Sequence, residues 1–200
     1  ALAVGRSLAP DGDLVMEVLR RQGQCLISLG RENEAIQVIG RSLSLARNQG
    51  DRCEEGVGRR ALAEALFALG DLESAHRHSA HSVALLEEVG ANHELAKSRL
   101  VRVRIGLARL DSGMGLDLVT ALDECWQQAL AAMDVFIKTG VEFWTLETRQ
   151  LLSIISGLRA EAANGATGSG QGSFSEKQRW PKVASTIVHV SSRIRDLIQL

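Results

Sequence analysis

The sequence predicts an all-α protein: a right-handed α-solenoid of antiparallel helical hairpins with a repeat of about 40 residues. Three observations lead to this prediction. Leu, Ile and Val recur at spacings of three and four residues, which is the pattern of helices with one buried face. Similar segments recur at a constant offset along the chain, and a glycine divides each of them. Only two prolines occur in 200 residues, so few positions forbid a helix.

The repeat is clearest in two segments that begin at Cys25 and Ala65. They read CLISLGRENEAIQVIGRSLSLARNQGD and ALFALGDLESAHRHSAHSVALLEEVGA. Three pairs of equivalent residues lie 40 positions apart: Gly30 and Gly70, Ala35 and Ala75, Gly50 and Gly90. Because one hairpin alone cannot bury its apolar face, we expect neighbouring units to stack on one another.

Glycine and aspartate mark the expected helix boundaries. Gly30 and Gly70 should end the first helix of each unit, because glycine adopts the left-handed C-cap conformation without strain. Asp71 should begin the next helix, where a carboxylate interacts favourably with the positive end of the helix dipole. Small residues are expected where the helices touch; these are Gly23, Ala35, Ala63, Ala75 and Cys125. Cys125 precedes Gly140 by fifteen positions, as Ala35 precedes Gly50.

A third unit is longer than the others, since Gly140 follows Gly90 by 50 positions. We expect its first helix at 95–110, a turn at 111–115 and a longer second helix at 116–139, with about ten inserted residues around the turn. Residues 141–158 should form the first helix of a fourth, incomplete unit. Residues 1–9 read as the second half of an earlier helix, and we expect both ends to continue in a longer polypeptide.

Ala63, Leu66, Gly70-Asp71 and Ala75 together resemble the tetratricopeptide repeat signature, and Gly23, Leu26, Gly30 and Ala35 carry the same pattern one unit earlier. Leu26, Leu66, Ile39 and Ser79 replace aromatic residues of that motif, the unit is longer, and no proline closes it. The longer, Gly-ended unit is similar to repeats of large bacterial signalling regulators, where a solenoid flanks an ATPase or DNA-binding domain. The resemblance implies a non-enzymatic sensor or docking module that binds a protein, a peptide or another domain of its own chain.

The resemblance also implies a peptide-binding groove along the first helix of each hairpin. The matching positions are Glu17, Arg20, Gln24, Arg60, Glu64, Phe67, Lys97 and Arg104. Arg20 and Arg60 occupy equivalent positions of successive units, so they should share one face, where their guanidinium groups can bind carboxylates. Alternatively, Arg20 and Arg60 pair with Glu17 and Glu64 on their own helices.

The sequence divides into a repeat domain at 1–159, a Gly-, Ala- and Ser-rich linker at 160–181, and a C-terminal segment at 182–200. Five apolar residues of that last segment form a heptad stripe: Val183, Ile187, Val190, Ile194 and Leu197. As an amphipathic helix, the segment can close the solenoid, lie in its groove, or pair with a second chain to make a dimeric scaffold. It also resembles the lead-in to the ATPase domain of sigma-54-dependent transcription activators.

The composition argues against several other classes of protein. Lys and Arg number 23 against 24 Asp and Glu, so we do not expect a nucleic-acid-binding surface. No apolar run is long enough for a membrane span, and no signal peptide is recognisable. Cys25, Cys53 and Cys125 form neither a CxxC pair nor a disulfide framework. We therefore interpret them as buried, reduced thiols in a cytoplasmic protein.

Candidate catalytic and ligand-binding residues are few. The sequence has no nucleophile–base pattern and no phosphate-binding glycine loop, so we expect neither an enzyme nor a cofactor. His78 and His81 are spaced to share a metal, but no Cys or carboxylate set completes a site, and we expect none. A basic stretch contains Lys97, Arg99, Arg102, Arg104 and Arg109. We interpret it as a solvated helix face rather than a patch for an acidic peptide or DNA.

Overall fold

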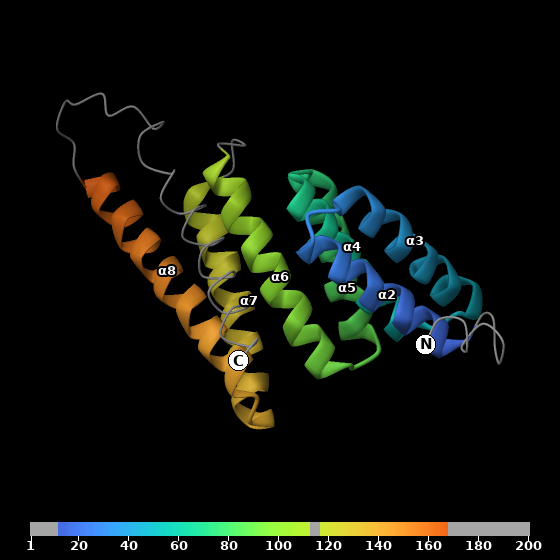
Figure 1. Cartoon of the computed structure of the whole chain (residues 1–200). Coiled ribbons are helices and arrows are strands. Elements are labelled where there is room, and N and C mark those ends of the chain that lie inside the picture. Colours follow the sequence, from blue (N-terminus) through green and yellow to red (C-terminus); the bar gives the residue numbers. More distant parts are fainter. Residues whose placement is uncertain (1–11, 113–116, 168–200) are drawn as a thin grey trace. The chain divides into compact units, whose positions relative to one another are not determined.

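The computed structural model describes residues 12–112 and 117–167, and every regular element within these residues is an α-helix (Figure 1). The helices are α2 (Asp13–Ser28), α3 (Glu32–Gln49), α4 (Arg52–Leu69), α5 (Leu72–Glu88), α6 (Asn92–Asp111), α7 (Leu118–Thr139) and α8 (Glu142–Thr167). The all-α prediction is confirmed for this part of the chain. Its expected helix positions in the third unit also agree with α6 and α7.

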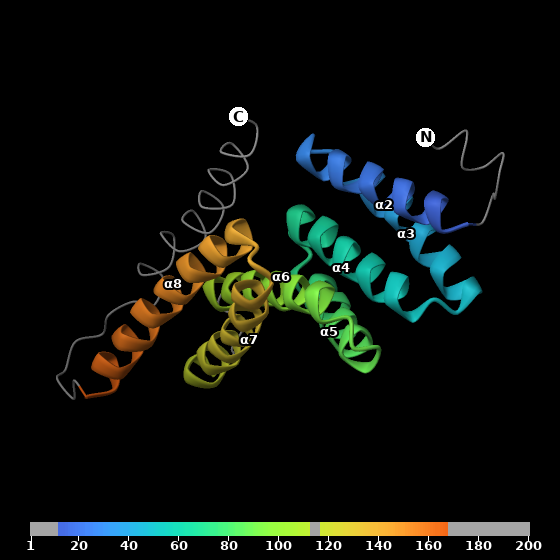
Figure 2. The ribbon, with the colours of Figure 1, turned by 90° about the horizontal axis from the view of Figure 1, so that it is seen from below.

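The chain forms two compact units, Ala1–Arg102 and Val103–Leu200, and α6 contributes residues to both. In the first unit α2 packs on α3, α3 on α4, and α4 on α5, and α2 also contacts α4 (Figures 1 and 2). One buried cluster joins α2, α3 and α4; it contains Leu26, Ala35, Ile39, Leu43, Ala61, Leu62 and Ala65. Ala35, Ile39 and Leu43 recur every four positions along α3, and Ala61 and Ala65 do so along α4, so amphipathic patterning places this cluster.

In the second unit α7 packs on α8, and the buried residues of α7 include Leu122, Ala129 and Phe136. The Phe136 and Trp144 rings stack with their centroids 5.9 Å apart. Cys125 lies buried against the end of α6 that belongs to this unit. A Cβ atom on Gly106 would lie 2.8 Å from the Cys125 sulfur. Glycine at position 106 therefore allows α6 and α7 to approach closely.

Glycines in the left-handed conformation end the helices at regular intervals. All five glycines with positive φ in the described residues lie at helix ends: Gly30, Gly50, Gly70, Gly90 and Gly140. At the end of α3, the Gly50 N–H donates to the Arg47 carbonyl and the Asp51 N–H donates to the Ala46 carbonyl. This is the Schellman pattern, which satisfies carbonyls that the helix itself leaves without partners.

Aspartate begins the next helix directly after two of these glycines. The Asp51 carboxylate accepts a hydrogen bond from the Glu54 N–H at 2.9 Å, and Asp71 accepts one from the Ser74 N–H at 3.0 Å. Only the pairs Gly50-Asp51 and Gly70-Asp71 therefore connect α3 to α4 and α4 to α5. Such short connections force consecutive helices to lie side by side.

At one contact between paired helices, the sizes of the two facing side chains change in opposite directions from one repeat to the next. A Cβ atom on Gly23 of α2 would lie 2.3 Å from the Ile39 side chain of α3. At the equivalent positions one repeat later, the larger Ala63 stands with the smaller Ser79, and both are buried. A gain in volume on one helix is thus matched by a loss on the other, which keeps packing dense.

Two features differ from the sequence-based expectations. Helix α8 continues to Thr167, beyond the expected end at 158 and into the segment assigned as a linker. Residues 160, 162 and 163 are alanines, which have the highest helix propensity, so the helix continues. Cys25 is exposed rather than buried, although all three cysteines are free thiols. Residues 1–9 and 182–200, which we assigned to helices, and most of the linker lie outside the described residues.

The left-handed glycines predict opposite effects of the same substitution at two sites. Gly70 has φ of +90°, so Gly70→Ala should lower the free energy of unfolding by about 1–2 kcal/mol. Gly40 lies within α3, and an added Cβ meets no atom within 4 Å. Gly40→Ala should therefore stabilise the protein by about 0.5–1 kcal/mol. Urea denaturation measures both, and equal effects at the two sites would contradict the assignment of Gly70 as a helix stop.

Candidate functional site

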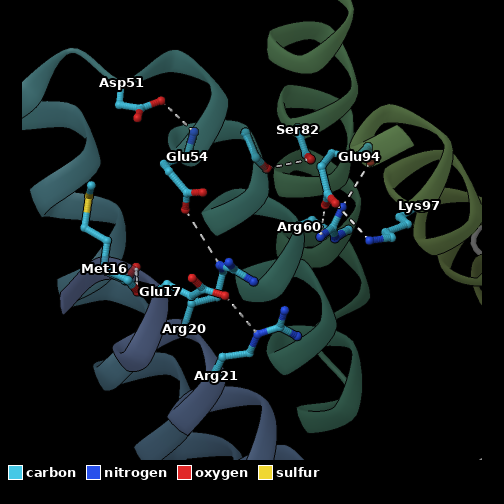
Figure 3. Close-up of polar contacts among 12 residues, drawn as sticks. Met16, Glu17, Arg20, Arg21, Asp51, Glu54, Arg60, Ser82, Glu94 and Lys97 are labelled. Atoms are coloured by element: carbon cyan, nitrogen blue, oxygen red, sulfur yellow. Dashed lines mark hydrogen bonds and ion pairs between the residues drawn. The ribbon is translucent and has the colours of Figure 1, made fainter. Parts of the chain in front are cut away.

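The two arginines predicted to line a groove each bind a glutamate on the next even-numbered helix (Figure 3). Arg20 of α2 lies 3.8 Å from the carboxylate of Glu54 at the start of α4. Arg60 of α4 lies 2.6 Å from the carboxylate of Glu94 at the start of α6 and also donates to the Glu94 carbonyl at 3.0 Å. Both arginine side chains are at least nine-tenths buried, at 8% and 7% exposure.

These partners differ from both of the expected ones. Arg20 and Arg60 pair with Glu54 and Glu94 instead of with Glu17 and Glu64 on their own helices. Glu17 lies 3.6 Å from Arg21. Each glutamate partner follows its arginine at the same separation in sequence, so the two ion pairs are equivalent contacts of successive repeats. Each one joins one even-numbered helix to the first turn of the next.

The two glutamates have opposite electrostatic environments. Burial raises the pKa of Glu54 above its ordinary value, and the more distant Arg20 only partly offsets this effect. Burial also disfavours ionised Glu94, but Arg60 and Lys97 together overcome it and lower its pKa to about 2. The Lys97 ammonium donates to the same carboxylate at 2.8 Å. Glu94 is therefore an ionised anchor for two cations from α4 and α6.

A second pair of buried polar contacts repeats in the same way. The Ser42 hydroxyl of α3 donates to the Met16 carbonyl of α2 at 2.8 Å. At the equivalent place in the next repeat, the Ser82 hydroxyl of α5 bonds the Gly56 carbonyl of α4 at 2.7 Å, and it also lies 2.8 Å from the Ser98 hydroxyl. Sequence reasoning missed these serines and both glutamates, although each pair recurs at the offset of the repeat.

The other predicted groove residues are more accessible. Gln24 on α2 and Glu64 and Phe67 on α4 are half-buried, and α2 and α4 are in contact within the first unit. Lys97 is half-buried beside Glu94. Arg104 belongs to the second unit, where it pairs with buried Glu147 of α8. The first unit therefore brings together charged and amide side chains and one aromatic ring from two adjoining helices.

Residues considered for other chemistry have structural partners. Arg59 lies 3.1 Å from His81 Nδ1, and burial together with Arg59 lowers the pKa of His78. Within the described part of the chain, no three His, Cys, Asp or Glu side chains are grouped to hold a metal ion. On the basic stretch of α6, Arg99 binds Glu87 at 3.0 Å with its side chain largely buried, so this position is not a fully solvated one.

Comparison with protein-family models gives no match to this chain, and comparison with curated protein sequences gives none either. Among the described residues, no helix is both long and apolar enough to cross a membrane.

The Glu94 contacts predict how acid destabilises the protein. Because its folded pKa of about 2 lies below the ordinary 4.5, ionised Glu94 stabilises the fold above about pH 4.5. This contribution, on the order of 3 kcal/mol, should disappear as the pH falls from 4.5 to 2. Glu94→Gln should therefore lower stability at pH 7 and flatten the acid dependence.

Glu54→Gln is the matched control. The pKa of Glu54 is raised, so replacing this carboxylate with a neutral amide removes the cost of burying its charge at pH 7. It should leave the acid dependence between pH 4.5 and 2 intact. Urea denaturation at pH 2.5, 4 and 7 distinguishes the variants. Parallel stability curves for the wild type and Glu94→Gln would show that Glu94 is not the ionised anchor.

Proposed function

We propose that this chain is a non-enzymatic protein–protein interaction module. Its fold would be a right-handed α-solenoid of antiparallel, tetratricopeptide-like hairpins. In the first unit, α2 and α4 would line the binding groove, and α3 and α5 would form the outer layer. The resemblance to bacterial signalling regulators supports a cytoplasmic sensor or docking region of a larger transcription or signalling protein.

One observation carries this proposal: the polar side chains of successive even-numbered helices repeat with the helices themselves. Arg20 and Arg60 make the same ion pair in successive repeats, and each ties its helix to the first turn of the next even-numbered helix. Buried ion pairs are expensive to desolvate and are best attested where they fix register. A surface whose helices are held in register is suited to presenting side chains to an extended partner.

In this proposal the arginines position the surface and their neighbours contact the partner. Arg60 donates hydrogen bonds to Glu94, and Arg20 lies 3.8 Å from Glu54, so a partner carboxylate would have to compete with a carboxylate already close by. Gln24, Glu64 and Phe67 remain partly accessible. An amide, a carboxylate and an aromatic ring favour an extended peptide that offers backbone hydrogen bonds and an apolar side chain.

The proposal can be tested by selecting peptides from a random displayed library against the full chain and measuring their affinity by fluorescence anisotropy. Truncating the accessible groove residues in the double variant Gln24→Ala/Phe67→Ala should weaken the selected peptides by about tenfold or more, since an aromatic anchor is worth at least about 1.4 kcal/mol. Arg20→Glu is unsuitable, because it would bury two carboxylates together and disturb the fold.

Gln37→Ala/Arg41→Ala is the matched control, since both residues are exposed on the odd-numbered helix α3. It should leave the affinity unchanged. Peptides whose binding depends on the α3 residues and ignores Gln24 and Phe67 would place the binding surface on the other side of the repeats. That result would overturn the proposal.

A further inference from the structure

Helix α7 has an apolar stripe in addition to the face that it buries. Val119, Leu130 and Ile137 are exposed at 58%, 40% and 61%, and Trp126 and Met133 between them are half-buried. These five residues are spaced by seven, four, three and four positions, so they lie along one side of the helix. We refer to them as the α7 stripe.

The α7 stripe is not a requirement of the repeat. Counted back from the glycine that ends each of α3, α5 and α7, the position of Ile137 is occupied by Arg47 in α3 and Glu87 in α5. Arg47 binds Glu55 at 3.1 Å and Glu87 binds Arg99 at 3.0 Å, so each forms an ion pair with the following even-numbered helix. The same count places Leu130 where α3 has glycine and α5 has alanine. Large apolar residues at these two positions are therefore particular to α7.

The α7 stripe borders α8. The Arg159 guanidinium of α8 lies 5.2 Å from the centre of the Trp126 ring and 2.7 Å from the Asp123 carboxylate. These contacts leave Val119, Leu130 and Ile137 exposed. Exposed apolar side chains in a row are typical of an interaction site.

We propose that the chain's own segment 183–197 docks on the α7 stripe as an amphipathic helix. The apolar residues of that segment are spaced by four, three, four and three positions: Val183, Ile187, Val190, Ile194 and Leu197. As a helix the segment would present about 21 Å of apolar edge, and the α7 stripe is about 27 Å long at about 1.5 Å per residue. The row of the segment is shorter than the α7 stripe and fits within its length, and both rows repeat at spacings of three, four or seven positions.

Tether length supports the same occupant. The chain from 167 to 183 can span about 50 Å, which exceeds the roughly 39 Å length of α8. The segment can therefore reach any part of the stripe, and its tether gives it a high effective concentration there. This docking does not depend on the proposed groove.

Hydrogen exchange of the full chain followed by mass spectrometry tests the proposal. The amides of residues 183–197 should be protected in the wild type, and Leu130→Asp/Ile137→Asp should raise their exchange rate by about tenfold or more. Ile187→Asp/Ile194→Asp should do the same from the other side of the contact. Leu14→Asp/Leu29→Asp is the matched control, because both leucines are exposed at the two ends of α2 and lie outside the stripe. It should leave the protection unchanged.

Three results would overturn the proposal. Exchange of residues 183–197 at the rate of an unstructured peptide in the wild type would show that nothing holds the segment. Protection that survives Leu130→Asp/Ile137→Asp, with α7 and α8 still protected, would place the segment elsewhere. Protection that grows with protein concentration, together with a dimeric mass by light scattering, would identify a second copy of the chain as the occupant.

Discussion

The structure depends on the two-residue connection of a left-handed glycine and a helix-capping aspartate. At Gly50-Asp51 and Gly70-Asp71 one pair of residues ends a helix, reverses the chain and begins the next helix. Glycine is needed because other residues are strained at positive φ, and aspartate is favoured because its carboxylate accepts an N–H that the new helix leaves free. Helix lengths and the distance between equivalent residues are fixed by where these pairs occur.

Once the connections fix the period, polar contacts between helices can recur with it. The pairs Arg20–Glu54 and Arg60–Glu94, and the hydrogen bonds of Ser42 and Ser82, are the same two contacts made twice. A shift of one helix by a single turn would break the hydrogen bonds of Arg60, Ser42 and Ser82 and leave these buried groups unpaired at considerable cost. The contacts therefore select one register among several that apolar packing alone would permit.

The sequence predicts the local structure well because the signals for it are local. Leucine spacing, left-handed glycines and capping aspartates act within one or two turns, and they locate α6 and α7 to within three positions. The end of α8 was missed because its alanines favour helix although their neighbours resemble a linker. The partners of Arg20 and Arg60 were missed for a different reason. Glutamates on the same helix are nearer in sequence, and only packing of α4 and α6 brings Glu54 and Glu94 to the guanidinium groups.

The most direct test of the repeat as the structural unit is to delete residues 52–91, which removes α4 and α5 and joins Asp51 to Asn92. The stability of this variant should be compared with that of a chain lacking residues 62–97, a deletion of similar size that joins α4 to α6 within the helices and four positions out of register. If the repeats are equivalent, the in-register deletion folds with a cooperative thermal transition and a proportionate loss of helical circular dichroism. The out-of-register chain should not fold cooperatively. Two variants that are equally unfolded, or equally folded, would contradict this account of the structure.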